Sequence, residues 1–255
     1  MGTVLAVVSQ KGGVGKTTTA INLASALARR GRKTLLVDVD PQGAVRHGVG
    51  LTGSEHPAGL ADVLAGTHEL QDVVLPTPLP WLRVLLAGTV AEAGEHESYH
   101  NELARSPKLG ELFKRARSRG YIVVVDTPPG LGAVTRRVLA HSEHVIVPLQ
   151  CEPLALQTTT QILRGIRSSL TDNSGLTLDG ILLTMVEPGN PTSERVAKYV
   201  REQLPAGLVL DTVIPRTAAS VEAFAAGQPV VLRSPDDPAA QAYRSLAAYL
   251  AGRLE

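Results

Sequence analysis

Short apolar runs recur along the chain, separated by longer segments in which apolar residues return every three or four positions. The runs are rich in Val, Ile and Leu and do not alternate with polar residues. Such runs are typical of strands covered on both faces of a parallel sheet. They predict strands at Thr3–Val8, Thr34–Val39, Tyr121–Val125, His144–Leu149, Leu178–Met185 and Val209–Ile214.

The segments between the runs carry helical periodicity. Thr17–Arg30 is the clearest, because its Ala and Leu residues gather on one face. The same spacing predicts helices at Leu154–Leu170, Ser193–Leu204 and Ala239–Leu254. Alternation of strands and helices throughout predicts an α/β fold, a doubly wound, mostly parallel sheet with helices on both faces.

Two stretches break this pattern, Pro76–Pro80 and Gly88–His100, and both are expected to be loop or irregular insertion. Neither is long enough to separate two domains, and 255 residues fit one domain. We therefore expect a single domain over residues 1–255. A basic run over residues 105–119 predicts a solvent-exposed helix.

Composition excludes several classes of protein. With 44% hydrophobic residues and a net charge of +1, the chain is neither disordered nor broadly basic, so contact with nucleic acid requires a local patch. The one cysteine excludes a disulfide scaffold and fits a cytoplasmic protein. No apolar run approaches the roughly 18 residues that span a bilayer, and we expect no membrane association.

A glycine-rich loop, SQKGGVGKTTT, joins the first strand to the first helix. Its glycines let backbone N–H groups converge on an anion, and the helix adds the positive end of its dipole. Lys16 can neutralise phosphate oxygens, and the Thr17 hydroxyl can bind Mg²⁺. This order of strand, loop and helix predicts a P-loop NTPase. The loop residues expected to bind nucleotide are Gly12, Gly13, Val14, Gly15, Lys16, Thr17 and Thr18.

One position departs from the general phosphate-loop pattern, because Gln10 stands where the first glycine is expected and Lys11 follows it. KGGVGKTT is a deviant Walker A motif, and here the sequence resembles the ParA/Soj/MinD family of ATPases, the Soj-like ParA proteins most closely. In that family the early lysine reaches across a nucleotide-sandwich dimer to the partner's phosphates. The resemblance implies an ATP-dependent homodimer in which Lys11 stabilises transition-state charge, as an arginine finger does.

The resemblance extends over nearly the whole chain. LLVDVDPQG, residues 35–43, implies that Asp40 positions the attacking water and that Asp38 lies behind it. VVVDTPPGLG, residues 123–132, implies that Asp126 holds Mg²⁺. The expected metal environment comprises Thr17, Asp126 and Asp40, and the expected catalytic residues are Lys11, Lys16 and Asp40.

The resemblance also implies ligands and partners. In the family, the IPR segment after a late strand contacts the adenine base, which assigns that role to Pro215 and Arg216. ATP and Mg²⁺ are the implied substrate and cofactor. A ParB-like protein is the implied activator of slow hydrolysis. Non-specific double-stranded DNA is the implied partner of the ATP-bound dimer, which would associate the protein with the nucleoid.

The positions at which the family often carries DNA-binding cations differ here. Gly189, Ala219 and Gln228 stand where basic residues are frequent, and an acidic pair begins at Asp236. Each lost phosphate contact lowers the salt slope by about one unit, which weakens binding. A solvated helix face explains the other cations equally well. The candidates to replace the missing contacts are Arg164, Arg167, Arg195, Lys198, Arg201 and Arg233.

Two further features have competing interpretations. HESYH at residues 96–100 matches the H-E-x-x-H zinc-protease signature. We interpret it as a chance match, since it lies in an insertion without a clear apolar face and the longer signature fails at Leu103 and Ser106. The last predicted helix is Ala/Leu-rich and lacks Trp, Phe and Lys, so we expect it to pack on the sheet rather than anchor to a membrane.

These features favour a ParA/Soj-type ATPase that serves chromosome or plasmid segregation. The missing cations motivate an alternative, a ParA-like positioning ATPase for another cargo with weak or no DNA binding. A MinD-like membrane-cycling ATPase is a further alternative. A metabolic P-loop enzyme that transfers phosphate to a small molecule is another, and the presence of Lys11 argues against it.

Overall fold

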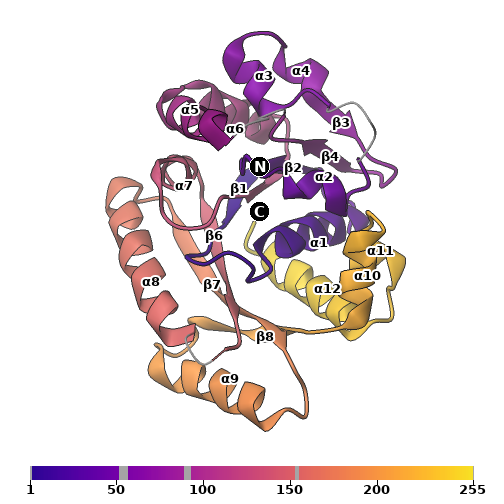
Figure 1. The fold of residues 1–255 in the computed structure, drawn as a ribbon, viewed down its shortest axis with the longest axis vertical. Helices are drawn as coiled ribbons and strands as arrows, with labels where there is room; N and C mark the ends of the chain where they lie inside the picture. Colours follow the sequence, from indigo (N-terminus) through magenta and orange to yellow (C-terminus); the bar gives the residue numbers. More distant parts are fainter. Residues whose placement is uncertain (1, 52–56, 89–92, 153–154, 255) are drawn as a thin grey trace.

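The computed structural model describes residues 2–51, 57–88, 93–152 and 155–254. Within these ranges the strands are β1 (Thr3–Val7), β2 (Thr34–Asp38), β3 (Val74–Pro76), β4 (Leu82–Leu85), β5 (Ile122–Asp126), β6 (His144–Gln150), β7 (Thr177–Val186) and β8 (Val209–Pro215). They form one sheet in the order β3-β4-β2-β5-β1-β6-β7-β8 (Figure 1). The β3–β4 pair is antiparallel and the other pairs are parallel.

Helices fill the connections between the strands. In the described ranges they are α1 (Lys16–Arg29), α2 (Ala44–Gly48), α3 (Leu60–Ala65), α4 (Leu70–Val73), α5 (Ala93–Arg105), α6 (Lys108–Ser118), α7 (Ala133–Leu139), α8 (Ala155–Asp172), α9 (Pro191–Gln203), α10 (Ala218–Ala225), α11 (Val230–Arg233) and α12 (Pro238–Ala251).

Alternation of side chains along the strands divides the apolar core in two. In β1, Val4 and Ala6 belong to one core cluster and Leu5 and Val7 to the other, as the two-residue period of a strand requires. All four side chains are fully buried. Burial on both faces explains why the strand sequences show no polar alternation.

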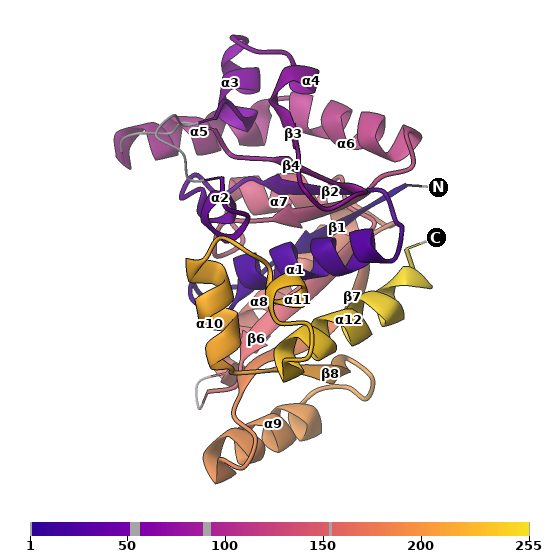
Figure 2. The same ribbon diagram turned by 90° about the vertical axis from the view of Figure 1, so that its right-hand side faces the viewer.

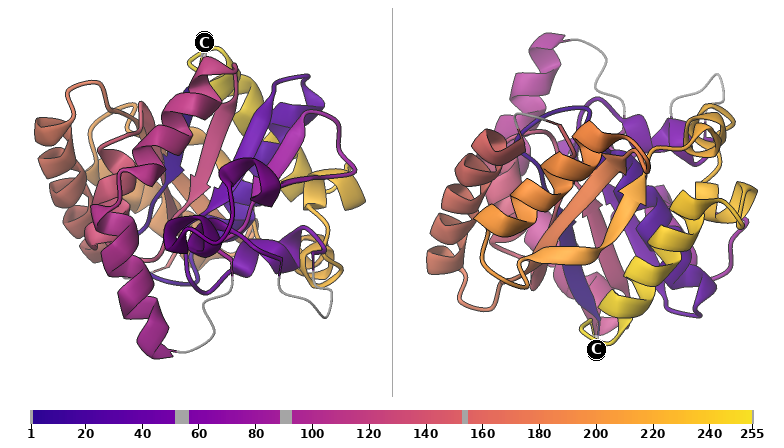
Figure 3. Two further views of the ribbon diagram at one scale, coloured as in Figure 1. Left: turned by 90° about the horizontal axis from the view of Figure 1, so that it is seen from above. Right: turned by 90° about the horizontal axis from the view of Figure 1, so that it is seen from below.

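Each core cluster is covered by its own layer of helices. Side chains from α3 to α9 pack on one face of the sheet, and side chains from α1, α2, α10, α11 and α12 pack on the other. Figure 2 shows α1 and α12 side by side, and the right panel of Figure 3 shows α12 across the strands from α8 and α9. The predicted doubly wound α/β class is therefore confirmed, and α12 packs against α1 and β8 as expected.

Parallel strands bring distant parts of the chain to one edge of the sheet. Val7 at the end of β1 and Asp38 at the end of β2 are both register partners of Asp126 at the end of β5. The loops that follow these strands therefore lie next to one another. Ligands bind at this carboxyl edge in open α/β sheets.

The segment around the HESYH motif differs from the expectation. The expectation of loop or irregular insertion at Gly88–His100 is wrong for residues 93–100, which belong to α5. Residues 89–92 lie outside the described residues. Tyr99 and Leu103 lie one helical turn apart and both are buried, so a short apolar face does exist. The two short strands β3 and β4 were also not predicted.

The basic run before β5 forms α6, as predicted, but only one of its faces is exposed. Lys114 and Arg115 are exposed, whereas Leu109, Leu112 and Phe113 are buried in the core. The helix is thus amphipathic and supports β5 from the same side as α5.

Candidate functional site

The glycine-rich loop lies between β1 and α1, at the carboxyl edge of the sheet. Gly13 and Gly15 have φ values of 78° and 84°, which side-chain-bearing residues rarely adopt. The Thr184 hydroxyl at the end of β7 donates to the Val14 carbonyl oxygen at 2.8 Å. The Gly130 amide, after β5, donates to the Ser9 carbonyl oxygen, also at 2.8 Å. These contacts hold the loop in a shape that leaves Gly12 and Gly13 exposed.

Thr17 and Asp126 are brought together as the sequence predicts. The Thr17 hydroxyl donates to Asp126 Oδ2 at 2.6 Å. Asp126 Oδ1 is buried and has no hydrogen-bond partner among the described residues. Burial raises the pKa of Asp126 to about 6, against the opposing influence of Lys16 and of the Thr17 hydrogen bond. The unpaired carboxylate oxygen of Asp126 and the neighbouring Thr17 hydroxyl are oxygen ligands of the kind that Mg²⁺ binds.

Asp38 and Asp40 occupy different environments two residues apart. Asp38 is fully buried and accepts hydrogen bonds from the backbone amides of Asp40, at 3.0 Å, and Val45, at 3.3 Å. Burial, reinforced by the charge of Asp126, raises the pKa of Asp38 well above its usual range. Asp38 therefore fixes the backbone of the loop after β2 through these hydrogen bonds. Asp40 is 8% exposed, and its Oδ1 accepts from the Gln42 amide at 3.0 Å.

The described residues contain no group of three or more His, Cys, Asp or Glu side chains that could hold a metal ion. This absence does not test the expected magnesium environment of Thr17, Asp126 and Asp40, because one of its members is a threonine hydroxyl, so this set remains a prediction. The same result applies to His96 and His100 in α5, which belong to no such group.

None of the described helices is long and apolar enough to cross a bilayer.

Lys11 lies on the exposed tip of the phosphate loop and is paired within its own chain. Its Nζ lies 2.6 Å from Glu152 Oε1, and its side chain is 49% exposed. Glu152 follows the end of β6, at the same edge of the sheet, and sequence reasoning did not identify it. The only available signal was a carboxylate after a buried strand.

A cavity of about 350 Å³ opens beside Gly15 and Thr18, between the phosphate loop and α10. Pro215 and Arg216 line it, as expected for a base-binding pocket. Arg216 Nε is held at 3.1 Å from Glu187 Oε1. Lining residues that sequence reasoning did not identify are Thr184, Met185, Thr217, Ser220, Val221, Phe224, Ala225 and Tyr243.

Met185 has a φ of 54°, which is uncommon for a side-chain-bearing residue. A Cβ atom added at Gly15 would lie 3.7 Å from the terminal methyl group of Met185. The end of β7 therefore packs closely against the phosphate loop and forms one wall of the cavity. Its apolar lining suits a planar base, and the adjacent loop suits phosphates.

The candidate DNA-binding cations are spread over separate helices. Arg164 and Arg167 are exposed on α8, and Arg195 and Lys198 are exposed on α9. Arg233 lies at the end of α11, in the helix layer on the opposite face of the sheet.

Arg201 differs from these cations. Its guanidinium donates to the Leu210 carbonyl oxygen at 2.8 Å and reaches the carbonyl oxygens of Val209 and Asp211 at 3.5 Å. Arg201 thus joins α9 to β8, and much of its hydrogen-bonding capacity is used inside the chain.

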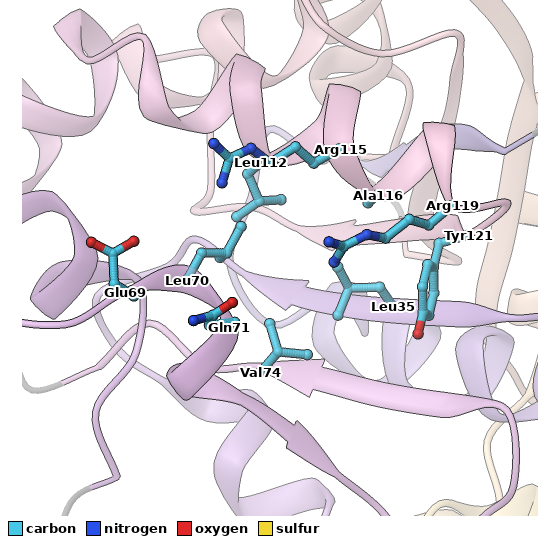
Figure 4. A pocket seen from close by; sticks show the side chains of 10 residues that line it. All are labelled: Leu35, Glu69, Leu70, Gln71, Val74, Leu112, Arg115, Ala116, Arg119 and Tyr121. Carbon is cyan, nitrogen blue, oxygen red and sulfur yellow. The ribbon is translucent and has the colours of Figure 1, made fainter.

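A second cavity, of about 220 Å³, lies between α4 and α6 and is lined by none of the predicted site residues. Figure 4 shows its apolar side chains, among them Leu70 and Leu112, with Arg119 and Tyr121 at one end. It shares no lining residue with the cavity beside the phosphate loop.

Comparison with known proteins agrees with this geometry. The family model of the AAA domain matches residues 2–177. The chromosome partitioning protein ParA of Caulobacter vibrioides is 41% identical over 254 residues, covering 96% of this chain and 92% of the relative. The sporulation initiation inhibitor protein Soj of Bacillus subtilis is 34% identical and covers 97% of each chain.

A solved structure matches over the same length. The septum site-determining protein MinD of Pyrococcus horikoshii, complexed with Mg-ADP, has a TM-score of 0.79 and 26% identity, covering 100% of this chain and 99% of the other. The full-length relatives, the phosphate loop and the sheet order point the same way. The chain belongs to the ParA/Soj/MinD family of P-loop ATPases.

Proposed function

We propose that this chain is an ATP-driven switch of the ParA/Soj type. It binds ATP and Mg²⁺, dimerises in that state, and returns to monomers when it slowly hydrolyses the nucleotide. Residues 1–255 act as one ATPase domain, which is supported by a single sheet with strands from Thr3 to Pro215. Segregation of a chromosome or plasmid is the output, as the name of the Caulobacter relative indicates for that protein.

The observation that carries the proposal is the meeting of Lys16, Thr17 and Asp126 at one edge of the sheet. Lys16 is buried to 7% exposure, and its charge is close enough to lower the pKa of Asp126 against the effect of burial. Both groups lie beside the exposed glycines of the loop. This arrangement suits a triphosphate and its cation better than an uncharged ligand.

Each residue then has a defined task. Lys16 and the loop amides bind phosphate oxygens, and Thr17 and Asp126 hold the metal, which supplies neutralisation of phosphate charge when bound. Asp40 orients the attacking water from the loop after β2. Pro215 and Arg216 contact the base in the cavity beside Gly15.

Lys11 acts on the partner subunit. Its exposed position at the loop tip lets it reach a second copy once it leaves Glu152. A cation delivered in this way stabilises transition-state charge, as an arginine finger does. Hydrolysis is therefore tied to dimerisation, and a ParB-like activator raises the rate by acting on the dimer.

DNA binding by the ATP-bound dimer is the part that most needs a direct test. Asp40→Ala, which blocks hydrolysis, is mixed with duplex DNA, ATP and Mg²⁺ and titrated with salt, with Lys16→Ala as the nucleotide-deficient control. ATP-dependent binding with a steep salt slope supports segregation on DNA. An ATP-dependent dimer that leaves DNA unbound contradicts it.

That contrary result would favour a second candidate function, a ParA-like positioning ATPase for another cargo. One observation supports this candidate. Gly189, Ala219 and Gln228 supply no charge at positions where the family resemblance implies DNA-binding cations, and Arg201 is engaged by backbone carbonyl oxygens of β8.

A further inference from the structure

A groove runs along helix α6, away from the phosphate loop. The cavity of about 220 Å³ between α4 and α6 continues into one of about 170 Å³ between α3 and α6. The two cavities share Glu69, Leu70, Leu112 and Arg115. Leu35, near the start of β2, and Tyr121, directly before β5, also line the groove. It therefore lies toward the amino ends of these strands, whereas the phosphate loop lies at the carboxyl edge of the sheet.

The floor of the groove is apolar. Leu112 of α6 is buried in the core, and Leu70, Val74 and Tyr121 are partly buried and pack against the same core cluster. The surface that these side chains keep exposed lines the cavity. A hollow of this kind can remove apolar side chains of a ligand from water, which is favourable.

Two basic residues of α6 are used inside the chain. Lys108 Nζ donates to the carbonyl oxygen of Val63 at 2.6 Å and to that of Leu64 at 3.0 Å. Arg117 forms an ion pair with Glu143. These two cations therefore hold α6 to its neighbours and are not available to a ligand.

Arg115 and Arg119 are different. They lie one helical turn apart and both are exposed, and neither guanidinium has a hydrogen-bond or ion-pair partner among the described residues. Figure 4 shows both side chains reaching from α6 and its end over the apolar side chains of the cavity, with Glu69 on the opposite side from Arg119. Arginine binds carboxylates through two parallel hydrogen bonds, so this pair complements an acidic ligand.

We propose that this groove binds an acidic segment of a partner protein, which places an apolar side chain on Leu70 and Leu112 and carboxylates on Arg115 and Arg119. The extension of the groove along α6 favours a peptide over a compact small molecule. The apolar floor favours a peptide over DNA, which binds chiefly through its phosphates. The groove shares no lining residue with the cavity beside the phosphate loop, so binding does not depend on the proposed ATPase cycle.

Selection of random short peptides displayed on phage tests the proposal. The wild-type chain is the bait, and the double variant Arg115→Ala with Arg119→Ala removes peptides that bind elsewhere. We expect the enriched peptides to carry Asp or Glu close to Leu, Ile or Phe. A fluorescein-labelled synthetic copy of one of them should bind the double variant about tenfold more weakly than the wild-type chain, as expected when hydrogen bonds between charged groups are lost.

Lys114→Ala is the matched control. Lys114 is an exposed cation of the same helix and does not line the groove. This variant should keep the wild-type affinity for the peptide to within about twofold. Replacing the apolar residue of the peptide with Ser should weaken binding about tenfold, because a large side chain is then no longer buried.

Four results would overturn the inference. Failure to enrich acidic peptides, or equal affinities of the wild-type chain and the double variant, would show that Arg115 and Arg119 recognise no such partner. Displacement of the peptide by ATP and Mg²⁺ would place it at the phosphate loop instead. Duplex DNA binding that the double variant loses would assign the surface to nucleic acid, and a dimer that the double variant loses would assign it to a second copy of the chain.

Discussion

The phosphate loop and the candidate DNA-binding cations form opposite kinds of region. At the loop, residues from β1, β5 and β7 converge within hydrogen-bond distance, as in the 2.6 Å contact between Thr17 and Asp126. The cations instead lie on α8, α9 and α11, on both faces of the sheet. Nucleotide chemistry requires a fixed constellation, whereas non-specific phosphate contacts require only charge at a suitable distance.

The largest expected effect lies on the loop side of this comparison. Lys16→Ala should weaken ATP binding about a hundredfold, as expected for loss of a charge-assisted hydrogen bond worth about 3 kcal/mol. Titration calorimetry with ATP and Mg²⁺ measures it, with Lys33→Ala, an exposed lysine outside the loop, as control. Equal affinities of the two variants would show that the loop is not the nucleotide site.

On the other side of the comparison, paired substitutions locate the DNA face. Arg195→Ala with Lys198→Ala should lower the salt slope of DNA binding by about one unit for each cation that contacts phosphate. Arg164→Ala with Arg167→Ala tests α8 in the same way. Lys114→Ala with Arg115→Ala on α6 is the control. Unchanged slopes for both test pairs would remove α8 and α9 from the DNA interface.

Arg201 should behave as a structural cation. Because its guanidinium donates to the Leu210 carbonyl oxygen, Arg201→Ala should lower the free energy of unfolding by about 1 kcal/mol. Urea denaturation measures this, with Arg167→Ala, an exposed arginine on α8, as the control that leaves stability unchanged. If Arg201→Ala lost affinity for DNA while its stability stayed unchanged, Arg201 would be a DNA-binding residue and not a structural one.

A smaller effect is expected on the strength of dimerisation when Glu152 is changed. The Lys11–Glu152 pair must open before Lys11 can reach a partner, and exposed ion pairs are worth up to about 1 kcal/mol. Glu152→Gln should therefore strengthen ATP-dependent dimerisation by up to about fivefold in Asp40→Ala, as measured by sedimentation equilibrium. Weaker dimerisation would show that Glu152 contributes to the interface rather than holding Lys11 back.

The smallest effect concerns pH and lies outside both regions. Burial, with the charges of Arg137 and Arg117, lowers the pKa of His141 below its usual value. The unfolded chain then binds more protons than the folded chain as pH falls below about 6.5, so this contribution to stability is present at neutral pH and lost in acid. The melting temperature of His141→Gln should fall less between pH 7 and pH 5 than that of the wild-type chain, and an equal or larger fall would contradict this assignment.

The phosphate loop and the fold class could be predicted from the sequence because both depend on residues that are contiguous along the chain. The glycines and the lysine of KGGVGKTT form the loop by themselves, and the apolar runs of the central strands reflect burial on both faces. The predicted strand ends differ from the observed ends by one residue at most. Asp38, Asp40 and Asp126 could be placed at one sheet edge because each ends or follows a parallel strand.

Contacts between distant segments could not be predicted in this way. Glu152 and Met185 are ordinary residues in the sequence and become part of the site only through the strand order. Helix α5 was missed because its apolar face is short, and the helix is held in place by its packing against α7, a distant segment of the chain. The edge strand β3 and its neighbour β4 are too short for their apolar residues to stand out.

In the proposed switch, ATP bound at this sheet edge drives dimerisation through Lys11. Sedimentation velocity of Asp40→Ala with ATP and Mg²⁺, with ADP and Mg²⁺, and without nucleotide tests it most directly. We predict a dimer with ATP only, and a return to monomer when Lys11→Ala is added. A monomer under all three conditions, or a dimer that forms without nucleotide or without Lys11, would contradict it.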